Sequence, residues 1–117
     1  MTAAELLIEI GIDPSTRGGR SLVWCTQQVS ADPTKGNDIV KGLYSEAAEH
    51  FGDDMKQEER NMRTQINRAE SSSRWWELLD AFEKRHRCAG LFTSNEHQTV
   101  KKLICRMAYV LNQEGAR

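Results

Sequence analysis

The sequence predicts an all-α protein of 117 residues that forms a single domain. Apolar residues recur at spacings of three, four and seven along several segments, which is the period of helices with one buried face. No segment shows the alternation of apolar and polar residues that is typical of a strand. A chain of this length can bury one hydrophobic core but not two, so residues 1–117 are expected to fold together.

Three short helices are expected in the first 40 residues. Ala3–Ile10 has apolar residues at helical spacing and is followed by a glycine, which commonly ends a helix. Arg20–Ser30 shows the same spacing and ends shortly before a proline. Asn37 or Asp38 can cap a brief third helix through residues 39–40, because both side chains accept hydrogen bonds from helical N–H groups.

The most informative segment predicts two helices joined by a tight turn. Leu43–Phe51 and Met55–Glu70 have helical spacing, and Gly52 between them supplies the backbone freedom of a sharp turn. Asp53 and Asp54 are suitable N-cap residues for the second helix, and their charge favours a helix N-terminus. This layout is typical of a helix-turn-helix in which the second helix reads DNA.

The recognition helix, Met55–Glu70, is expected to have one buried and one exposed side. A helix turns by about 100° per residue, so residues three, four and seven apart share a side. The buried side is expected to hold Met55, Met62, Ile66 and Ala69, and the exposed side Gln57, Arg60, Asn61, Thr64 and Arg68. The exposed side is expected to contact solvent unless a partner binds it.

Two further helices are expected near the C-terminus. Trp75–His86 repeats apolar residues at helical spacing. Because the adjacent Trp75 and Trp76 cannot share one face, one of them is expected to stay partly exposed and is a candidate dimer contact. Thr93–Glu96 fits a capping box that opens a long last helix. The buried stripe of that helix is expected to consist of Val100, Leu103, Ile104, Met107 and Leu111.

Several classes of protein are excluded by what the sequence lacks. It has no apolar run long enough for a membrane span and no secretory leader, so we expect a cytoplasmic protein without a membrane partner. The cysteines form no CxxC pair, and Cys25 and Cys105 lie on apolar helical faces, so reduced structural thiols are expected. The three histidines are isolated and expected at the surface, so no metal site is predicted. No catalytic constellation or phosphate-binding loop is present, so we expect no enzyme, cofactor or small-molecule substrate.

The charge of the chain is divided unevenly. The formal net charge is −1, which by itself does not favour a nucleic-acid partner, because phosphate binding relies on Lys and Arg. Residues 1–55 hold four Lys/Arg against nine Asp/Glu, whereas residues 56–106 hold eleven against seven. This division is compatible with one basic face and one acidic back, and also with ordinary solvation of the surface.

Four segments occur in an order and spacing that resemble one known family. They are LLIEIGIDPSTRGGRSLVWCTQQV, GLYSEAAEHF, ERNMRTQINRA and FTSNEHQTVKKL, and together they extend from about Glu5 to Met107. In these segments the chain is similar to the C-terminal DNA-binding effector domain of the master sporulation response regulator of spore-forming Firmicutes. The resemblance implies a six-helix domain whose helix-turn-helix reads the major groove of a short DNA box, as tandem or dimeric copies.

The resemblance places base contacts on the first turns of the recognition helix, at Gln57, Glu59 and Arg60. Arg60 is the strongest candidate, because a guanidinium can hold O6 and N7 of guanine, worth roughly 1–3 kcal/mol of discrimination. Its alternative role is an ion pair with a neighbouring carboxylate. Gln57 can read adenine or complete a capping box with Asp54. Glu59 can accept a hydrogen bond from cytosine N4 or pair with Arg63.

Phosphate contacts are expected from two groups of side chains, which would fix the register on DNA without carrying sequence information. The recognition helix offers Lys56, Arg63, Thr64 and Arg68. A second basic cluster offers Lys84, Arg85 and Arg87. This second cluster either clamps the adjacent DNA backbone or stabilises a helix C-terminus through the helix dipole.

The chain departs from the family pattern where the recognition helix begins. Asp53, Asp54, Glu58 and Glu59 place four carboxylates there, which is unusual beside phosphate groups. Gln57 stands where the family has a basic residue, and Glu58 replaces an apolar one. The DNA sequence that the family recognises can therefore not be assumed for this chain. No stretch predicts parallel strands with an acidic pocket, so the resemblance does not extend to a phosphorylated receiver domain. If the chain is complete, control is expected from abundance or from a partner, and if it is a fragment of a longer regulator this expectation fails.

Two functions of different classes follow from these observations. The first is a sequence-specific transcriptional regulator that docks Met55–Glu70 in the major groove of double-stranded DNA, as a homodimer on two half-sites, and acts on the transcription machinery. The second is a protein-interaction module of the same fold that has lost or weakened DNA binding. It would bind another regulator through Trp75 and Trp76 or through the acidic N-terminal half, and the acidic turn favours it.

Overall fold

The computed structural model describes residues 1–92 and 98–115. Within these residues the fold is helical throughout and contains no strand, which confirms the all-α prediction and the six helices implied by the resemblance. The α-helices are α1 (Ala3–Glu9), α2 (Arg17–Ala31), α3 (Tyr44–Phe51), α4 (Met55–Glu70), α5 (Trp75–His86) and α6 (Val100–Gly115). A 3₁₀-helix, η1 (Pro33–Asn37), and a turn of π-helix, η2 (Ile39–Leu43), connect α2 to α3.

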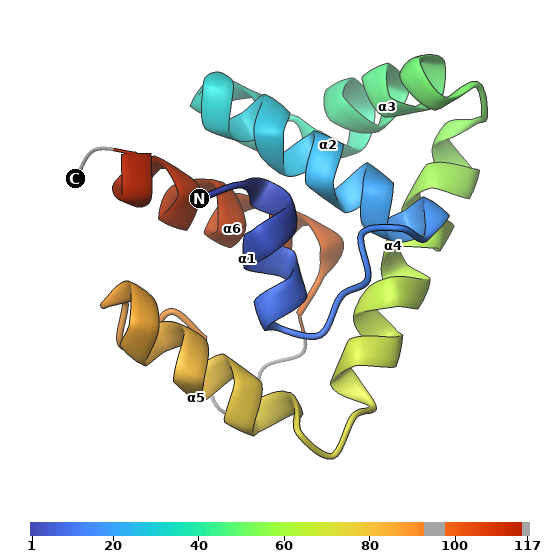
Figure 1. Cartoon of the computed structure of the whole chain (residues 1–117). Coiled ribbons are helices and arrows are strands. Elements are labelled where there is room, and N and C mark those ends of the chain that lie inside the picture. The colour runs from blue at the N-terminus through green and yellow to red at the C-terminus, as the bar shows by residue number, and fades with distance from the viewer. Residues whose placement is uncertain (93–97, 116–117) are drawn as a thin grey trace.

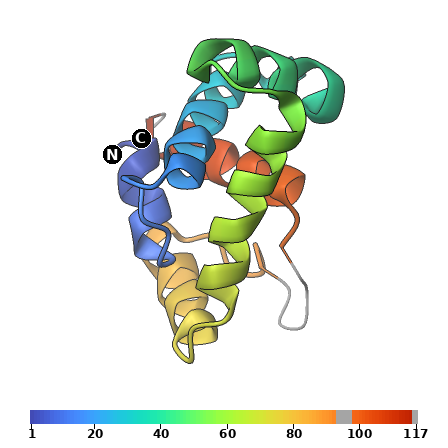
Figure 2. The same ribbon diagram turned by 90° about the vertical axis from the view of Figure 1, so that its right-hand side faces the viewer.

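Helix α2 occupies the centre of the molecule. It packs against α4, α6, α1 and α3, and Figure 1 shows it starting beside α4 and ending at the upper left of the molecule. Helix α4 forms one edge, and Figure 2, which faces that edge, shows α3 at its N-terminal end and α5 at its C-terminal end. The outer side of α4 is therefore not covered by another helix.

The hydrophobic core draws on every α-helix. Fully or almost fully buried apolar side chains include Leu6, Leu7, Leu22, Cys25, Ala47, Met62, Ile66, Leu79, Phe82, Leu103, Ile104 and Met107. Burying one large aliphatic or aromatic side chain stabilises a fold by about 1.5–3 kcal/mol. The core therefore fixes α4 against α2 and α6 and leaves its opposite side for other contacts.

Helix α2 begins at Arg17, three residues before the predicted start. Thr16 is the N-cap, and its hydroxyl oxygen accepts a hydrogen bond from the Gly19 N–H at 3.0 Å. Gly18 and Gly19 lower helix propensity in the first turn, which hid this start in the sequence. The fold needs Gly18, because a Cβ there would lie 2.0 Å from the carbonyl oxygen of Asn61 on α4.

The brief third helix was predicted with a cap from Asn37 or Asp38, and the structure corrects this. Asp32 instead caps the 3₁₀-helix, accepting a hydrogen bond from the Thr34 N–H at 3.2 Å. Asp38 precedes η2, but its side chain makes no capping hydrogen bond. The π-turn continues directly into α3, so this part of the chain is held by backbone hydrogen bonds rather than by a side-chain cap.

The last helix begins at Val100. The Thr99 hydroxyl accepts a hydrogen bond from the Lys102 N–H at 3.1 Å, as an N-cap side chain does. The predicted capping box at Thr93–Glu96 lies outside the described residues. The expected stripe is buried at Val100, Leu103, Ile104 and Met107, whereas Leu111 is half-buried.

His86 was expected at the surface and is instead buried. Its Nε2 lies 2.8 Å from Oε2 of Glu9 on α1, and its Nδ1 lies 2.8 Å from Oε1 of Glu114 on α6. The ring therefore links three helices. His50 is exposed, as predicted, and its ring stacks on Trp24 with centroids 4.9 Å apart.

The cysteines behave largely as expected. Cys25 is buried in the core, whereas Cys105 and Cys88 are half-buried. None of the helices in residues 1–92 and 98–115 combines the length and hydrophobicity of a membrane-spanning segment.

Candidate nucleic-acid interface

The turn between α3 and α4 has the geometry of a helix-turn-helix. Gly52 adopts φ 75° and ψ 33°, and its N–H donates to the Ala48 carbonyl at 2.9 Å, closing α3. Ala48 is buried, as a slim residue on the first helix of such a pair should be. Asp54 then caps α4, accepting a hydrogen bond from the Gln57 N–H at 2.8 Å. The predicted bounds of α4, Met55–Glu70, are confirmed.

The inner side of α4 is only partly the one predicted. Met62, Ile66 and Ala69 are buried as expected. Met55 is 37% exposed, because it is the first residue of the helix and lies beyond the crossing with the core. Glu58 is fully buried instead, and a repeat of apolar residues could not have identified it.

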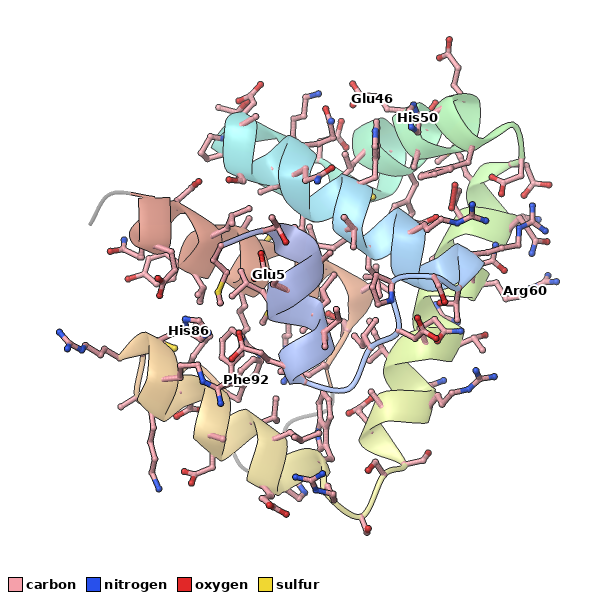
Figure 3. The ribbon with its side chains drawn as sticks, viewed as in Figure 1. Glu5, Glu46, His50, Arg60, His86 and Phe92 are labelled. Carbon is pink, nitrogen blue, oxygen red and sulfur yellow. The ribbon has the colours of Figure 1, made fainter. Side chains whose placement is uncertain are left out.

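The outer side of α4 presents Arg60 to solvent. Figure 3 shows its side chain extending outward from the helix, away from the rest of the molecule. Lys56, Thr64 and Arg68 are also exposed. Among residues 1–92 and 98–115, Arg60 has no ion-pair partner, so the alternative of an ion pair with a neighbouring carboxylate is not formed.

The side chains of Gln57 and Glu59 are held by other residues of α4. The Gln57 amide donates a 2.8 Å hydrogen bond to Oδ1 of Asn61, and the capping box with Asp54, one of the two roles considered for Gln57, does not form. Glu59 forms an ion pair with Arg63, four residues later, which is the second of the two roles predicted for it. A base contact from Gln57 or Glu59 would have to compete with these pairings.

The four carboxylates at the start of α4 do not form one negative surface. Glu58 is buried against α2, where the Ser21 hydroxyl donates to its Oε2 at 2.6 Å. Burial raises the pKa of Glu58, and the neighbouring Asp53 raises it further. Asp53 lies mostly buried beside Arg17, with 3.8 Å between Oδ2 and Nη2. The other two carboxylates are the Asp54 cap and the Glu59 ion pair described above, so each is engaged locally.

A comparison with known protein families matches residues 3–104 to the family described as "Sporulation initiation factor Spo0A C terminal". The match covers most of the 117 residues, including all of the helix-turn-helix. The chain belongs to this family. A search of curated proteins found no significant match.

Membership in the Spo0A C-terminal family identifies the chain as a helical DNA-binding domain of the sporulation transcription factor type. The family resemblance drawn from four short segments is thereby confirmed. The unusual residue relative to that resemblance, Glu58, is accommodated by Ser21 on a neighbouring helix. The carboxylate that weakened the DNA hypothesis is thus turned away from the outer side of α4.

The second basic cluster is separate from the outer side of α4 in this Spo0A C-terminal domain. Figure 3 places His86, which lies within the cluster, at the opposite side of the molecule from Arg60. Lys84 forms an ion pair with Asp80 at 2.9 Å, and Arg85 pairs with Glu9. Arg87 caps α5 with a left-handed backbone, φ 55°. The fold does not bring the two predicted groups of phosphate contacts together.

Sequence reasoning missed two arginines, Arg17 and Arg20, in the first turn of α2. Both are exposed and line a polar cleft of about 130 Å³ together with Ser21, Phe51, Asp53 and Asn61. The local signal was present, because Thr16 followed by Gly19 fits an N-cap. The two glycines after Arg17 made a later start of the helix look more probable.

Proposed function

We propose that this domain is a sequence-specific transcriptional regulator that places α4 in the major groove of double-stranded DNA. The observation that carries the proposal is the exposed guanidinium of Arg60, with which no described residue pairs, on a helix whose inner side is anchored in the core. In this role Arg60 donates two hydrogen bonds to O6 and N7 of a guanine.

The other residues of α4 divide into two roles in this proposal. Gln57 and Glu59 contact bases beside the guanine after they exchange their pairings with Asn61 and Arg63 for hydrogen bonds to DNA. Lys56, Arg63, Thr64 and Arg68 contact phosphates. The proposal for Lys84, Arg85 and Arg87 is weaker, because two of them are in ion pairs and the cluster lies away from Arg60. Binding as a homodimer on two half-sites would double these contacts.

Selection from a random duplex library at fixed salt tests the function directly. We expect one motif to be enriched. Arg60→Ala should weaken binding to that motif by roughly 1–3 kcal/mol and weaken binding to random duplex much less. Arg74→Ala is the matched control, since it removes the same charge from an exposed side chain already paired with Glu77. Enrichment of no motif, or equal losses on selected and random duplex, would contradict the proposal.

A protein-interaction module remains the second candidate, because Trp76 is 47% exposed. A large exposed aromatic side chain is common at binding interfaces. This candidate predicts that Trp76→Ala abolishes capture of the partner while DNA affinity is unchanged. The regulator proposed above predicts that Arg60→Ala abolishes the response of a reporter gene.

A further inference from the structure

We infer that Arg17 and Arg20, on the first turn of α2, bind the phosphate backbone of the same DNA that α4 reads. This inference rests on the function proposed above. It extends the interface to a second helix, which the sequence alone did not associate with DNA.

Close backbone packing places this turn of α2 beside α4. Gly18 lies so near α4 that an added Cβ would be 2.0 Å from the Asn61 carbonyl oxygen and 2.7 Å from Cγ of Gln65. Figure 1 shows the same approach of the two helices. The residues on either side of this glycine pair, Arg17 and Arg20, therefore have fixed positions relative to the recognition helix.

The position of Asn61 shows which flank of α4 faces the first turn of α2. At about 100° per residue, Asn61 lies about 100° around α4 from Arg60. Lys56 and Arg63 lie about 40° and 60° from Arg60 in the other direction. A helix in the major groove has a phosphate strand along each flank, so side chains on both flanks can reach phosphates. The α2 arginines supply cations on the Asn61 flank, opposite Lys56 and Arg63.

The cleft beside this flank offers donors with little internal competition. Arg20 is exposed and has no ion-pair partner in the part of the chain that the structure describes. Arg17 is 66% exposed and approaches Asp53 only at 3.8 Å, the outer limit of an ion pair. The Asn61 amide is held by Gln57, which donates to its Oδ1, and its Nδ2 is buried without a hydrogen-bond partner among the described residues, so the donors open to a phosphate are the two guanidinium groups. A phosphate oxygen is an acceptor that satisfies such donors.

Two substitutions of equal charge test the inference. Arg20→Ala should weaken binding by roughly three- to tenfold, equally on the selected site and on random duplex, because phosphates carry no sequence information. The slope of log K against log salt should fall by about 0.9 for the one lost contact. Arg74→Ala, which removes the same charge from an exposed side chain already paired with Glu77, should change neither quantity by as much. Circular dichroism confirms that both variants are folded.

A methylphosphonate scan of the selected duplex locates the contact. Neutralising the phosphate that Arg20 contacts should weaken binding of the unmodified protein to the duplex. The same modification should leave the affinity of the Arg20→Ala variant unchanged. Arg17→Ala should behave in the same way at a neighbouring phosphate on the same strand.

The possible failures are distinguishable. If Arg60→Ala no longer binds the selected site but Arg20→Ala behaves like Arg74→Ala, the present inference is overturned and the proposed function stands. If the unmodified protein enriches no DNA motif, the proposed function fails and this inference fails with it. Loss of affinity for the selected site alone, with random duplex unchanged, would assign Arg20 to bases and overturn the phosphate role.

Discussion

The Ser21 hydroxyl donates a 2.6 Å hydrogen bond to the carboxyl group of Glu58 across the interface between α2 and α4. Glu58 is fully buried, and its second oxygen has no hydrogen-bond partner among the described residues. Desolvation raises the pKa of Glu58 above its ordinary value of 4.5, and the Ser21 hydrogen bond only partly opposes this effect. Anchoring of the recognition helix is therefore linked to the protonation of one inward-facing side chain.

We expect Glu58→Gln to stabilise the protein at pH 7. Below pH 4.5 the carboxyl group is protonated in both the folded and the unfolded state, so it makes no pH-dependent contribution. As pH rises through the ordinary value and then the raised one, the unfolded state loses the proton more readily, and the folded state becomes less stable. Glutamine stays neutral and can still accept the Ser21 hydrogen bond. Urea denaturation from pH 3.5 to 7.5 should show the variant's advantage growing with pH.

The matched control for this experiment is Glu49→Gln, which makes the same chemical change on an exposed side chain of α3. It should leave the pH dependence of stability close to that of the unmodified protein. A Glu58→Gln variant that is less stable than the unmodified protein at pH 7 would show that the buried carboxylate is stabilising and refute the prediction.

Sequence reasoning located the elements whose signals are local. Met55–Glu70 was predicted with the bounds that the structure shows, because the Asp54 cap and the apolar repeat lie within the helix itself. Trp75–His86 was found from its apolar repeat alone, since no side chain caps its start. The start of α2 was missed, because Gly18 is there to let α4 approach, and a contact between residues more than 40 positions apart leaves no local pattern.

The candidate site divides in the same way. The exposure of Arg60 followed from helical geometry alone. The burial of Glu58 depends on Ser21, 37 residues away, and the burial of His86 on Glu9, 77 residues away. His86 was expected at the surface, and Glu58 was counted among the carboxylates that would lie beside phosphate groups, because a charged or titratable side chain is usually exposed; only the tertiary partners make the exceptions possible.

We expect Gly18→Ala to destabilise the protein by about 1–3 kcal/mol or more, the usual cost of overpacking. The added methyl group would overlap backbone atoms of Asn61, which cannot move aside as the end of a flexible side chain can. The helices α2 and α4 must then separate. Thermal unfolding of the variant measures the loss.

Gly52→Ala is the informative comparison for this substitution. Nothing lies within 4 Å of a Cβ at Gly52, so its cost of about 1–2 kcal/mol is that of a left-handed backbone alone. DNA affinity separates the two cases. Gly18→Ala should reduce it at a temperature where the protein remains folded, because the α2 flank shifts relative to α4. Equal affinity for Gly18→Ala and the unmodified protein would refute this displacement.

We expect His86→Ala to lower the free energy of unfolding by about 1–3 kcal/mol, less than for a fully buried ion pair because Glu9 and Glu114 keep some solvent contact. Both ring nitrogens lie 2.8 Å from carboxylate oxygens, Nε2 from Glu9 and Nδ1 from Glu114, so the alanine variant leaves two partly buried carboxylates without this partner. Arg85→Ala removes an exposed partner of Glu9 and should cost less than about 1 kcal/mol. A larger loss for Arg85→Ala than for His86→Ala would contradict the role assigned to the ring.

We expect the Cys25 thiol to resist alkylation at pH 8 until the domain unfolds. Burial raises its pKa to about 12, with Glu58 and Glu46 adding to the effect, so almost no thiolate is present to react. The half-buried Cys88 provides the internal comparison and should be modified in the native protein. Mass spectrometry after iodoacetamide treatment, with and without urea, distinguishes the two sites. Because Cys25 lies on α2 within the core, its rate should follow global unfolding, and modification at the Cys88 rate would show that α2 opens locally.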